Sequence, residues 1–342
     1  MTATLPPRRP DVVPAAERHG VGDDGLSVLF SLAAVERRAH RVPNLLIAGV
    51  SHAGVDDLRQ ALGQHPDIAV PSKRVHRYTP LRYGRAVETA LADYDRLFVA
   101  HEHHAPRYRL ETSPGYFDGG RTLVETVNRE LLGLRVIVVL RDPAERLWAS
   151  YSDKLARGRL PEGFSFESFV ERGLALRANG CDRFESNRHF RTLASGHYVD
   201  HLATWLDVFG RRVQIAFAED LEVAPAAGVA GLVDWLDLEP VAALPDVAVP
   251  PAMLTTSDGE RLHSFGDDVV RRGWSTLARP AGTWRPAEVA SGLRRVARPF
   301  LPRQADRVRA KVEAMYASPN RDLAAMLRDR GLTDLPTWLT RA

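Results

Sequence analysis

Short apolar segments alternate with amphipathic ones along most of the chain. The segments predicted to form strands are 45–48, 68–70, 107–112, 134–140 and 213–218. The segments predicted to form helices, from apolar spacing and from start and stop signals, are 26–39, 54–63, 122–132, 143–157, 198–208 and 228–236. Strands that alternate with helices in this way predict a mainly parallel sheet with helices on both faces. The expected fold class is therefore α/β, a three-layer αβα sandwich.

The two ends of the chain and one internal stretch depart from this alternation. Residues 1–25 are rich in Pro, Arg and Asp and have no apolar core, which predicts a disordered or loosely attached arm and not a signal peptide. Residues 240–300 combine Pro, Ala and Arg with weak periodicity, and we expect them to wrap a cleft or form a lid. Two short helices, 307–315 and 321–327, are predicted on either side of a Ser-Pro-Asn sequence. Residues 26–342 are expected to form a single domain.

The turn after the first predicted strand has the layout of a phosphate-binding loop. A buried strand leads into a turn bounded by Gly49 and Gly54, and a helix follows at once. In this layout, backbone N–H groups and the positive end of the helix face an anion. The turn has no Gly-Lys-Ser/Thr sequence, which argues against a nucleotide kinase or NTPase. The expected fold is therefore P-loop-like, with a loop of altered chemistry.

Polar residues stand at the ends of other predicted strands. Glu111 to Pro114, Arg141 to Pro143, and Glu219 with Asp220 each follow a strand. Ligands of parallel α/β sheets bind at the carboxyl ends of the strands. We expect these segments and the glycine-bounded turn to line one cleft.

Composition excludes several classes of function. The chain has 342 residues, 44% of them apolar, and a net charge of +3. No basic run with interleaved aromatic residues indicates nucleic-acid binding, and no apolar run is long enough to span a membrane. Cys181 is the single cysteine, which excludes a disulfide framework and a cysteine metal site. We expect a cytoplasmic protein.

Nearly all the positive charge is carried by arginine. Lys73, Lys154 and Lys311 are the three lysines among 46 basic residues. Arginine suits bidentate binding of phosphate, sulfate and carboxylate. The base composition of the genome is the alternative explanation of this bias.

Four short motifs follow one another along the chain. Residues 49–56 are Gly-Val-Ser-His-Ala-Gly-Val-Asp, residues 73–78 are Lys-Arg-Val-His-Arg-Tyr, residues 111–116 are Glu-Thr-Ser-Pro-Gly-Tyr, and residues 140–146 are Leu-Arg-Asp-Pro-Ala-Glu-Arg. In this order they resemble the motifs of PAPS-dependent sulfotransferases, in the branch with bacterial, heparan-sulfate-type and other carbohydrate sulfotransferases. The resemblance extends over residues 43–338, apart from the stretch predicted to form a lid.

This resemblance implies a reaction. A sulfuryl group would pass from PAPS, the co-substrate, to a hydroxyl or amine of a carbohydrate or small metabolite, without a metal. Sulfuryl transfer resembles phosphoryl transfer, so catalysis rests on positioning and on neutralising charge at the leaving oxygen. The implied partner is the carbohydrate or small-molecule acceptor, and a homodimer is left open.

The resemblance also implies donor-binding residues. They lie in the loop and in the helix after the fourth predicted strand, and they are Ser51, His52, Ala53, Gly54, Val55, Asp56, Arg141 and Ser150. Arg141 stands at the position of the arginine that binds the 3′-phosphate in the family. The family serine eight residues further on is Ala149 here, with Ser150 beside it. One helical step is about 100°, so Ser150 points in a different direction from the family serine.

Three loop residues depart from the family pattern. His52 replaces the loop lysine, and Val55 and Asp56 replace two threonines. A histidinium can donate a hydrogen bond to the leaving oxygen, but its charge depends on a pKa that is ordinarily about 6.5. In the alternative interpretation, His52 has no chemical role. Asp56 would repel the donor unless an arginine pairs with it.

His76 and Glu111 are the candidate bases for the acceptor, and Lys73 is expected to line the same cleft. Arg74 replaces the glutamate that some family members use as base. Glu111 has the alternative role of an ion pair or cap at the end of its strand. The altered loop leaves two hypotheses of function open. One is a working sulfotransferase, and the other is a protein with this fold that has lost transfer and acts as a binding or assembly partner.

Overall fold

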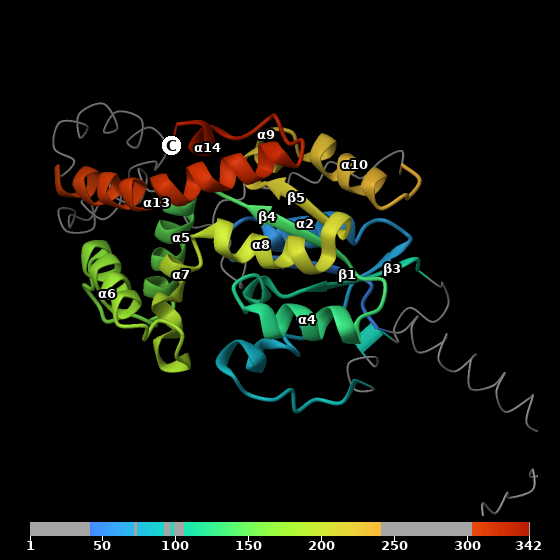
Figure 1. The fold of residues 1–342 in the computed structure, drawn as a ribbon, viewed down its shortest axis with the longest axis horizontal. Helices are drawn as coiled ribbons and strands as arrows, with labels where there is room; N and C mark the ends of the chain where they lie inside the picture. The colour runs from blue at the N-terminus through green and yellow to red at the C-terminus, as the bar shows by residue number, and fades with distance from the viewer. Residues whose placement is uncertain (1–41, 72–73, 92–96, 99–105, 241–302, 342) are drawn as a thin grey trace, which may run out of the picture. The chain divides into compact units, whose positions relative to one another are not determined.

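The computed structural model describes residues 42–71, 74–91, 97–98, 106–240 and 303–341 (Figure 1). All of them belong to one compact unit of the chain, Arg41–Ala342. The predicted arm, the helix predicted before the first strand, Lys73, and the predicted lid from residue 241 onward lie outside the described residues.

The centre of the fold is a five-stranded sheet in which all neighbouring strands are parallel. In chain order the strands are β1 Leu45–Gly49, β2 Ile68–Ala69, β3 Tyr108–Thr112, β4 Arg135–Leu140 and β5 Val213–Phe217. The order across the sheet is β2-β3-β1-β4-β5, so β1 lies in the middle. Every residue of β1 is buried, as expected for a parallel strand covered on both faces.

Helices connect the strands and cover the sheet. They are α2 Val55–Leu62, α4 Arg121–Glu130, α5 Pro143–Ala156, α6 Phe166–Ala178, α7 Arg191–Ala194, α8 Tyr198–Phe209, α9 Ala218–Val223, α10 Pro225–Trp235, α13 Arg303–Asp329 and α14 Thr337–Thr340, with short 3₁₀ turns at Thr79–Tyr83, Pro114–Tyr116, Glu185–Phe190 and Gly210–Arg212. In the view of Figure 1, α4 and α8 lie in front of the sheet and α2 lies behind it. Within the sheet layer and its covering helices, α4 packs against α8, and α10 packs against α2. The predicted αβα sandwich with a parallel sheet is confirmed.

The local sequence determines where α5 begins, at the carboxyl edge of the sheet. Asp142 follows β4, and its Oδ1 accepts hydrogen bonds from the backbone N–H groups of Ala144 (2.8 Å) and Glu145 (3.4 Å). Pro143 takes the first helical position, where no N–H is needed. The backbone N–H of Asp142 donates to Oε1 of Glu219, just after β5 (2.9 Å). The ends of β4 and β5 therefore meet, as predicted.

Buried apolar side chains form two clusters. The larger one consists of the sheet and the helices that cover it. The smaller one joins α5, α6, α7 and part of α13, and its largest side chains are Trp148, Tyr151, Phe166, Phe169 and Tyr316. In Figure 1, α5, α6 and α7 gather together at the left. The carboxyl edge of the sheet thus faces a second, aromatic core.

The prediction of two separate C-terminal helices is wrong. A single helix of 27 residues, α13, continues through Pro319. A proline inside a helix removes one backbone hydrogen bond and usually ends the helix. Here one apolar stripe runs along both sides of the proline, and its buried members are Val308, Val312, Tyr316, Leu323 and Leu327. The packing of this stripe against α5, α6 and α8 outweighs the missing hydrogen bond.

Candidate functional site

The turn between β1 and α2 has the backbone geometry of an anion-binding loop. Gly54 has a φ of 72° and precedes α2, and no side chain caps the helix. The first N–H groups of α2 thus lack a side-chain acceptor at the N-cap. Gly49 is required by space, since a Cβ there would lie 2.5 Å from Cβ of Phe117. The loop is therefore pressed closely against the segment that follows β3.

Neighbouring strand ends hold the loop in place. The backbone N–H of Phe117 donates to Ala48 O (3.0 Å), and that of Val50 donates to Val139 O (2.8 Å). Arg141, at the end of β4, is buried, and its Nη1 donates to the carbonyl of His52 (3.2 Å). The structure thus brings Arg141 to the loop, as expected. This hydrogen bond is to the loop backbone, and the predicted contact of Arg141 with a 3′-phosphate stays a prediction.

A cavity of about 150 Å³ opens beside this loop. Its walls come from the loop, the segment after β3, α5, and the segment that contains α7, and they are lined by Val50, Ser51, His52, Arg82, Pro114, Gly115, Phe117, Asp118, Arg146, Lys154, Arg188, Arg191, Thr192 and Ser195. These residues include five basic side chains and one carboxylate. A concave site with this balance favours an anionic ligand.

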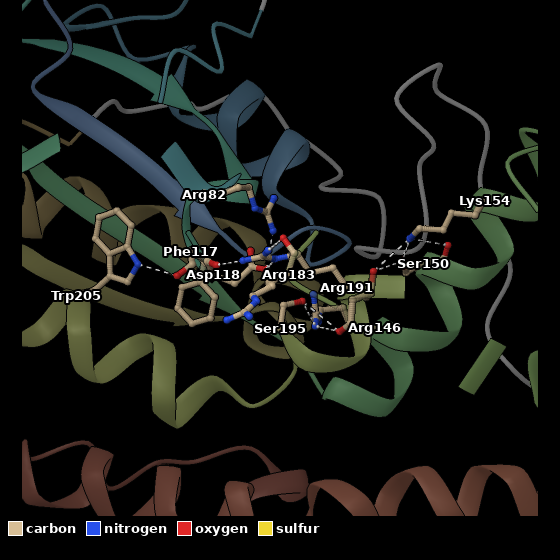
Figure 2. A network of polar contacts seen from close by, with 11 residues as sticks. Arg82, Phe117, Asp118, Arg146, Ser150, Lys154, Arg183, Arg191, Ser195 and Trp205 are labelled. Carbon is tan, nitrogen blue, oxygen red and sulfur yellow. Dashed lines mark hydrogen bonds and ion pairs between the residues drawn. The ribbon is translucent and has the colours of Figure 1, made fainter. Parts of the chain in front are cut away.

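The one carboxylate of the cavity wall, Asp118, is already paired. It accepts from Arg82 Nη2 (2.6 Å) and Arg191 Nε (2.7 Å), and Figure 2 shows its carboxylate between the two guanidinium groups. Burial acts to raise the pKa of Asp118, but Arg82 and Arg191 outweigh it and bring the pKa down to about 2. The cavity wall therefore has no second carboxylate to pair with its other basic side chains, which are Arg146, Lys154 and Arg188.

Two further basic side chains reach the wall from α5. Arg146 Nη2 donates to Thr192 O (2.8 Å) and Ser195 Oγ (3.0 Å). Lys154 Nζ donates to Ser150 O (3.3 Å), Ser150 Oγ and Thr192 Oγ1 (3.2 Å). In the part of the chain that the structure describes, neither side chain forms an ion pair with a carboxylate. Both side chains contact Thr192 of α7, and Figure 2 shows them in the polar network of the cavity wall.

Burial is the main reason that the pKa of Lys154 falls to about 7. Asp153 acts in the opposite direction, and Arg146 and Arg159 lower the pKa further. Lys154 thus sits near the midpoint of its titration at neutral pH. Its ionisation will respond strongly to any anion that enters the cavity.

Ser150, a predicted donor-binding residue, is fully buried and bonded within this network. Its Oγ shares a hydrogen bond of 2.7 Å with Thr192 Oγ1 and accepts another from Lys154. It is absent from the cavity wall, while Ala149 is buried in the protein interior. A direct contact of Ser150 with the donor stays a prediction.

His52 lines the cavity and is half-buried, with a φ of 66°. Burial, followed by the charges of Lys154 and Arg146, lowers the pKa of His52 well below its ordinary value. In the absence of an anion, His52 is therefore neutral at neutral pH, unlike the lysine that it replaces. Of the other predicted loop residues, Ser51 also lines the cavity, whereas Ala53 and Val55 are buried.

Asp56 does not face the cavity. Its carboxylate forms an ion pair with Arg74, and both side chains are about one-third exposed. The negative charge of Asp56, which follows the loop, is thus neutralised by Arg74. Burial and Asp56 together raise the pKa of the next residue, Asp57, to about 6.

The two candidate bases are connected through one serine. Ser113 Oγ donates to Oε1 of the fully buried Glu111 (2.8 Å) and lies 3.3 Å from Nδ1 of His76. Because Ser113 donates to Glu111, it accepts from His76 Nδ1–H, which leaves Nε2 able to accept a proton. Burial raises the pKa of Glu111 to about 7, although hydrogen bonds from Ser113 and Tyr116 act against it. His76 and Glu111 are thus brought together, but neither lines the cavity.

Sequence reasoning missed most of the basic wall. Arg82, Arg188 and Arg191 belong to no motif, and nothing local marks them. Lys154 had a usable signal, because it lies four residues after Ser150 and therefore on the same face of α5. It is also one of only three lysines in the chain.

Comparison with known proteins places these features in a family context. No family model matches the chain. The chain is 23% identical over 207 residues to the bifunctional heparan sulfate N-deacetylase/N-sulfotransferase 1 of Caenorhabditis briggsae. The matched region covers 58% of this chain and 23% of that protein. It is 25% identical over 211 residues to human heparan sulfate glucosamine 3-O-sulfotransferase 3A1, covering 60% and 47% of the two chains. This chain therefore spans about a quarter to a half of the length of these relatives.

A solved structure has the same fold. The sulfotransferase from Alicyclobacillus acidocaldarius superposes with a TM-score of 0.53 at 20% identity, covering 67% of this chain and 90% of that one. The protein therefore has a sulfotransferase fold. Its sequence is similar to heparan sulfate sulfotransferases, and the predicted resemblance is confirmed.

None of the helices in the described residues is both long and apolar enough to cross a membrane. No group of three or more His, Cys, Asp or Glu side chains in those residues is arranged to hold a metal ion.

Proposed function

We propose that the protein is a sulfotransferase that moves a sulfuryl group from PAPS to a hydroxyl or amine of a carbohydrate or small metabolite. One observation supports this function above all. A cavity with surplus basic side chains lies directly against the phosphate-type loop of a sulfotransferase fold. The cytoplasmic location stays a prediction.

The residues at this site suit the donor. Phosphate and sulfate groups carry negative charge, and the wall offers basic side chains together with the uncapped N-terminus of α2. Arg141 holds the loop carbonyl, and so keeps the loop N–H groups in one orientation. Arg74 removes the repulsion that Asp56 would otherwise exert. When bound, PAPS would supply the sulfuryl group and the leaving oxygen.

His76 is the proposed base, and Ser113 and Glu111 are its positioning residues. The reaction forms a bond between the acceptor oxygen or nitrogen and sulfur, and breaks the bond between sulfur and the bridging oxygen of the donor. The acceptor proton passes to Nε2 of His76, whose Nδ1–H is held by Ser113. Glu111 accepts from Ser113 and so fixes the direction of the chain of hydrogen bonds. The leaving group is PAP.

Binding and transfer can be measured separately. PAP binding by calorimetry tests the donor site, and transfer from radiolabelled PAPS to heparan-type saccharides and small hydroxylated compounds tests the reaction. Arg141→Ala should weaken PAP binding by about tenfold, since it frees the loop. Arg121→Ala is the matched control, because Arg121 is exposed on α4. Binding without transfer to any acceptor would favour the alternative of a binding protein, and no PAP binding would overturn both.

A further inference from the structure

We propose that Lys154, from α5, contacts the anionic group of the donor at the loop, where His52 stands in place of a lysine. This inference rests on the proposed function, because it assigns a role within the same donor site. It concerns a residue outside the motifs on which the resemblance depends.

The first argument is placement. Lys154 and His52 line the same cavity, although they come from different elements. On α5, Arg146, Ser150 and Lys154 follow one another at intervals of four residues and therefore form one row. This row faces Thr192, which contacts all three side chains. Lys154 is thus oriented by neighbours on two elements, although its side chain is long and flexible.

The second argument is charge balance. Asp153, the adjacent carboxylate, is bonded to Arg157 Nε (2.7 Å), and Asp118 is bonded to Arg82 and Arg191. The three hydrogen bonds of Lys154 go to neutral oxygens. A buried ammonium group whose neighbouring carboxylate is already bonded to an arginine is poorly compensated. A phosphate or sulfate in the cavity would supply a counter-charge.

The third argument is the protonation of Lys154 and His52, because burial lowers the pKa of both groups in the free protein. The pKa of Lys154 is about 7, and that of His52 is lowered well below its ordinary value. The charged or titratable groups that face Lys154 are Asp153, Arg146, Arg159, His52 and His189. An anion beside Lys154 favours the ammonium form, so binding should be accompanied by proton uptake. An ordinary exposed lysine, charged in both states, would show no such uptake.

The test is calorimetry with PAP as the probe at pH 8, in two buffers with different heats of ionisation. The wild-type protein should take up protons on binding PAP. Lys154→Met should bind PAP at least tenfold more weakly and lose most of the uptake, whereas Lys154→Arg should retain affinity without uptake. Lys311→Met is the matched control, since Lys311 is half-exposed on α13. Thermal unfolding verifies that Lys154→Met is folded, and removing a buried charge should not destabilise it.

Rescue provides a second, independent measurement. Lys154→Met should lower the turnover number by about a hundredfold, as expected for a lost transition-state contact. His52→Lys in the same chain should restore at least a tenth of the wild-type rate, because it returns a lysine to the loop. The inference is wrong if wild-type protein binds PAP while Lys154→Met keeps the same affinity, uptake and rate. Failure of the wild-type protein to bind PAP would instead overturn the proposed function itself.

Discussion

Glu111 is expected to destabilise the protein in the pH range where it is ionised. Its side chain is fully buried, and its pKa rises from 4.5 to about 7 on folding, chiefly through burial. A folded pKa above the unfolded one means that the contribution to stability is complete below pH 4.5. It is then lost as the pH rises through about 7. Over the whole range this loss corresponds to about 3 kcal/mol.

Replacement of Glu111 by Gln removes this titration and keeps an oxygen that can accept from Ser113. Between about pH 5.5 and pH 8.5 the titration of Glu111 should lower the free energy of unfolding of the wild-type protein by about 2 kcal/mol. The variant has no such titration and should not show this decrease. The stability gap between Glu111→Gln and wild type should therefore widen by that amount in favour of the variant. The same substitution should lower the turnover number about a hundredfold if the carboxylate orients Ser113 and His76. At high pH the variant would then have gained stability relative to wild type, and it would be less active.

Urea denaturation of both proteins at the two pH values measures the gap. All other titrating groups are shared, so their contributions cancel in the difference between the proteins. Glu125→Gln, at an exposed position of α4, controls for the loss of one charge. A gap that is the same at both pH values would refute the assignment of a raised pKa to Glu111.

Two further substitutions test the charges around the cavity. Asp118→Asn leaves Arg82 and Arg191 without their carboxylate, and should destabilise the protein by about 2 to 4 kcal/mol at pH 7. Because the pKa of Asp118 is lowered from 3.8 to about 2, wild type loses this advantage as the pH falls through that range, and urea denaturation at pH 7 and pH 3 should show the difference shrinking. Arg74→Ala exposes the donor to the charge of Asp56 and should weaken PAP binding a few-fold by calorimetry, while Asp56→Asn in the same chain should restore it. Lack of restoration would show that Arg74 acts in some other way.

The sheet and its order of elements could be predicted because their signals are local. The continuous apolar run that forms β4 and the Asp142-Pro143 start of α5 each determine an element without reference to the rest of the chain. The course of α13 could not be predicted in the same way. The proline argues locally for a break, and only contacts with distant helices reverse that conclusion.

The candidate site likewise combines residues that motifs predict with residues that only contacts between distant segments bring together. The loop and the positions of Arg141, His76 and Glu111 follow from motifs. Ser113 lies within one of these motifs, but its position between the two bases depends on the folded arrangement of two separate segments. The basic wall combines residues separated by more than a hundred positions, and Arg191 carries no signal in its neighbourhood. Charge balance in a cavity is a property of several elements together, so one stretch of sequence cannot reveal it.

The contact between α13 and α7 has a consequence for the order in which the protein is completed. Tyr316 donates from its hydroxyl to Leu193 O (2.8 Å), and a Cβ on Gly196 would collide with the same ring. Thr192 and Ser195, on either side of this contact, belong to the cavity wall. During synthesis the sheet and loop emerge long before α13, and one wall of the cavity stays without its support until that helix has left the ribosome. A nascent chain would therefore have its loop early, but would acquire the complete cavity wall only once α13 has been made.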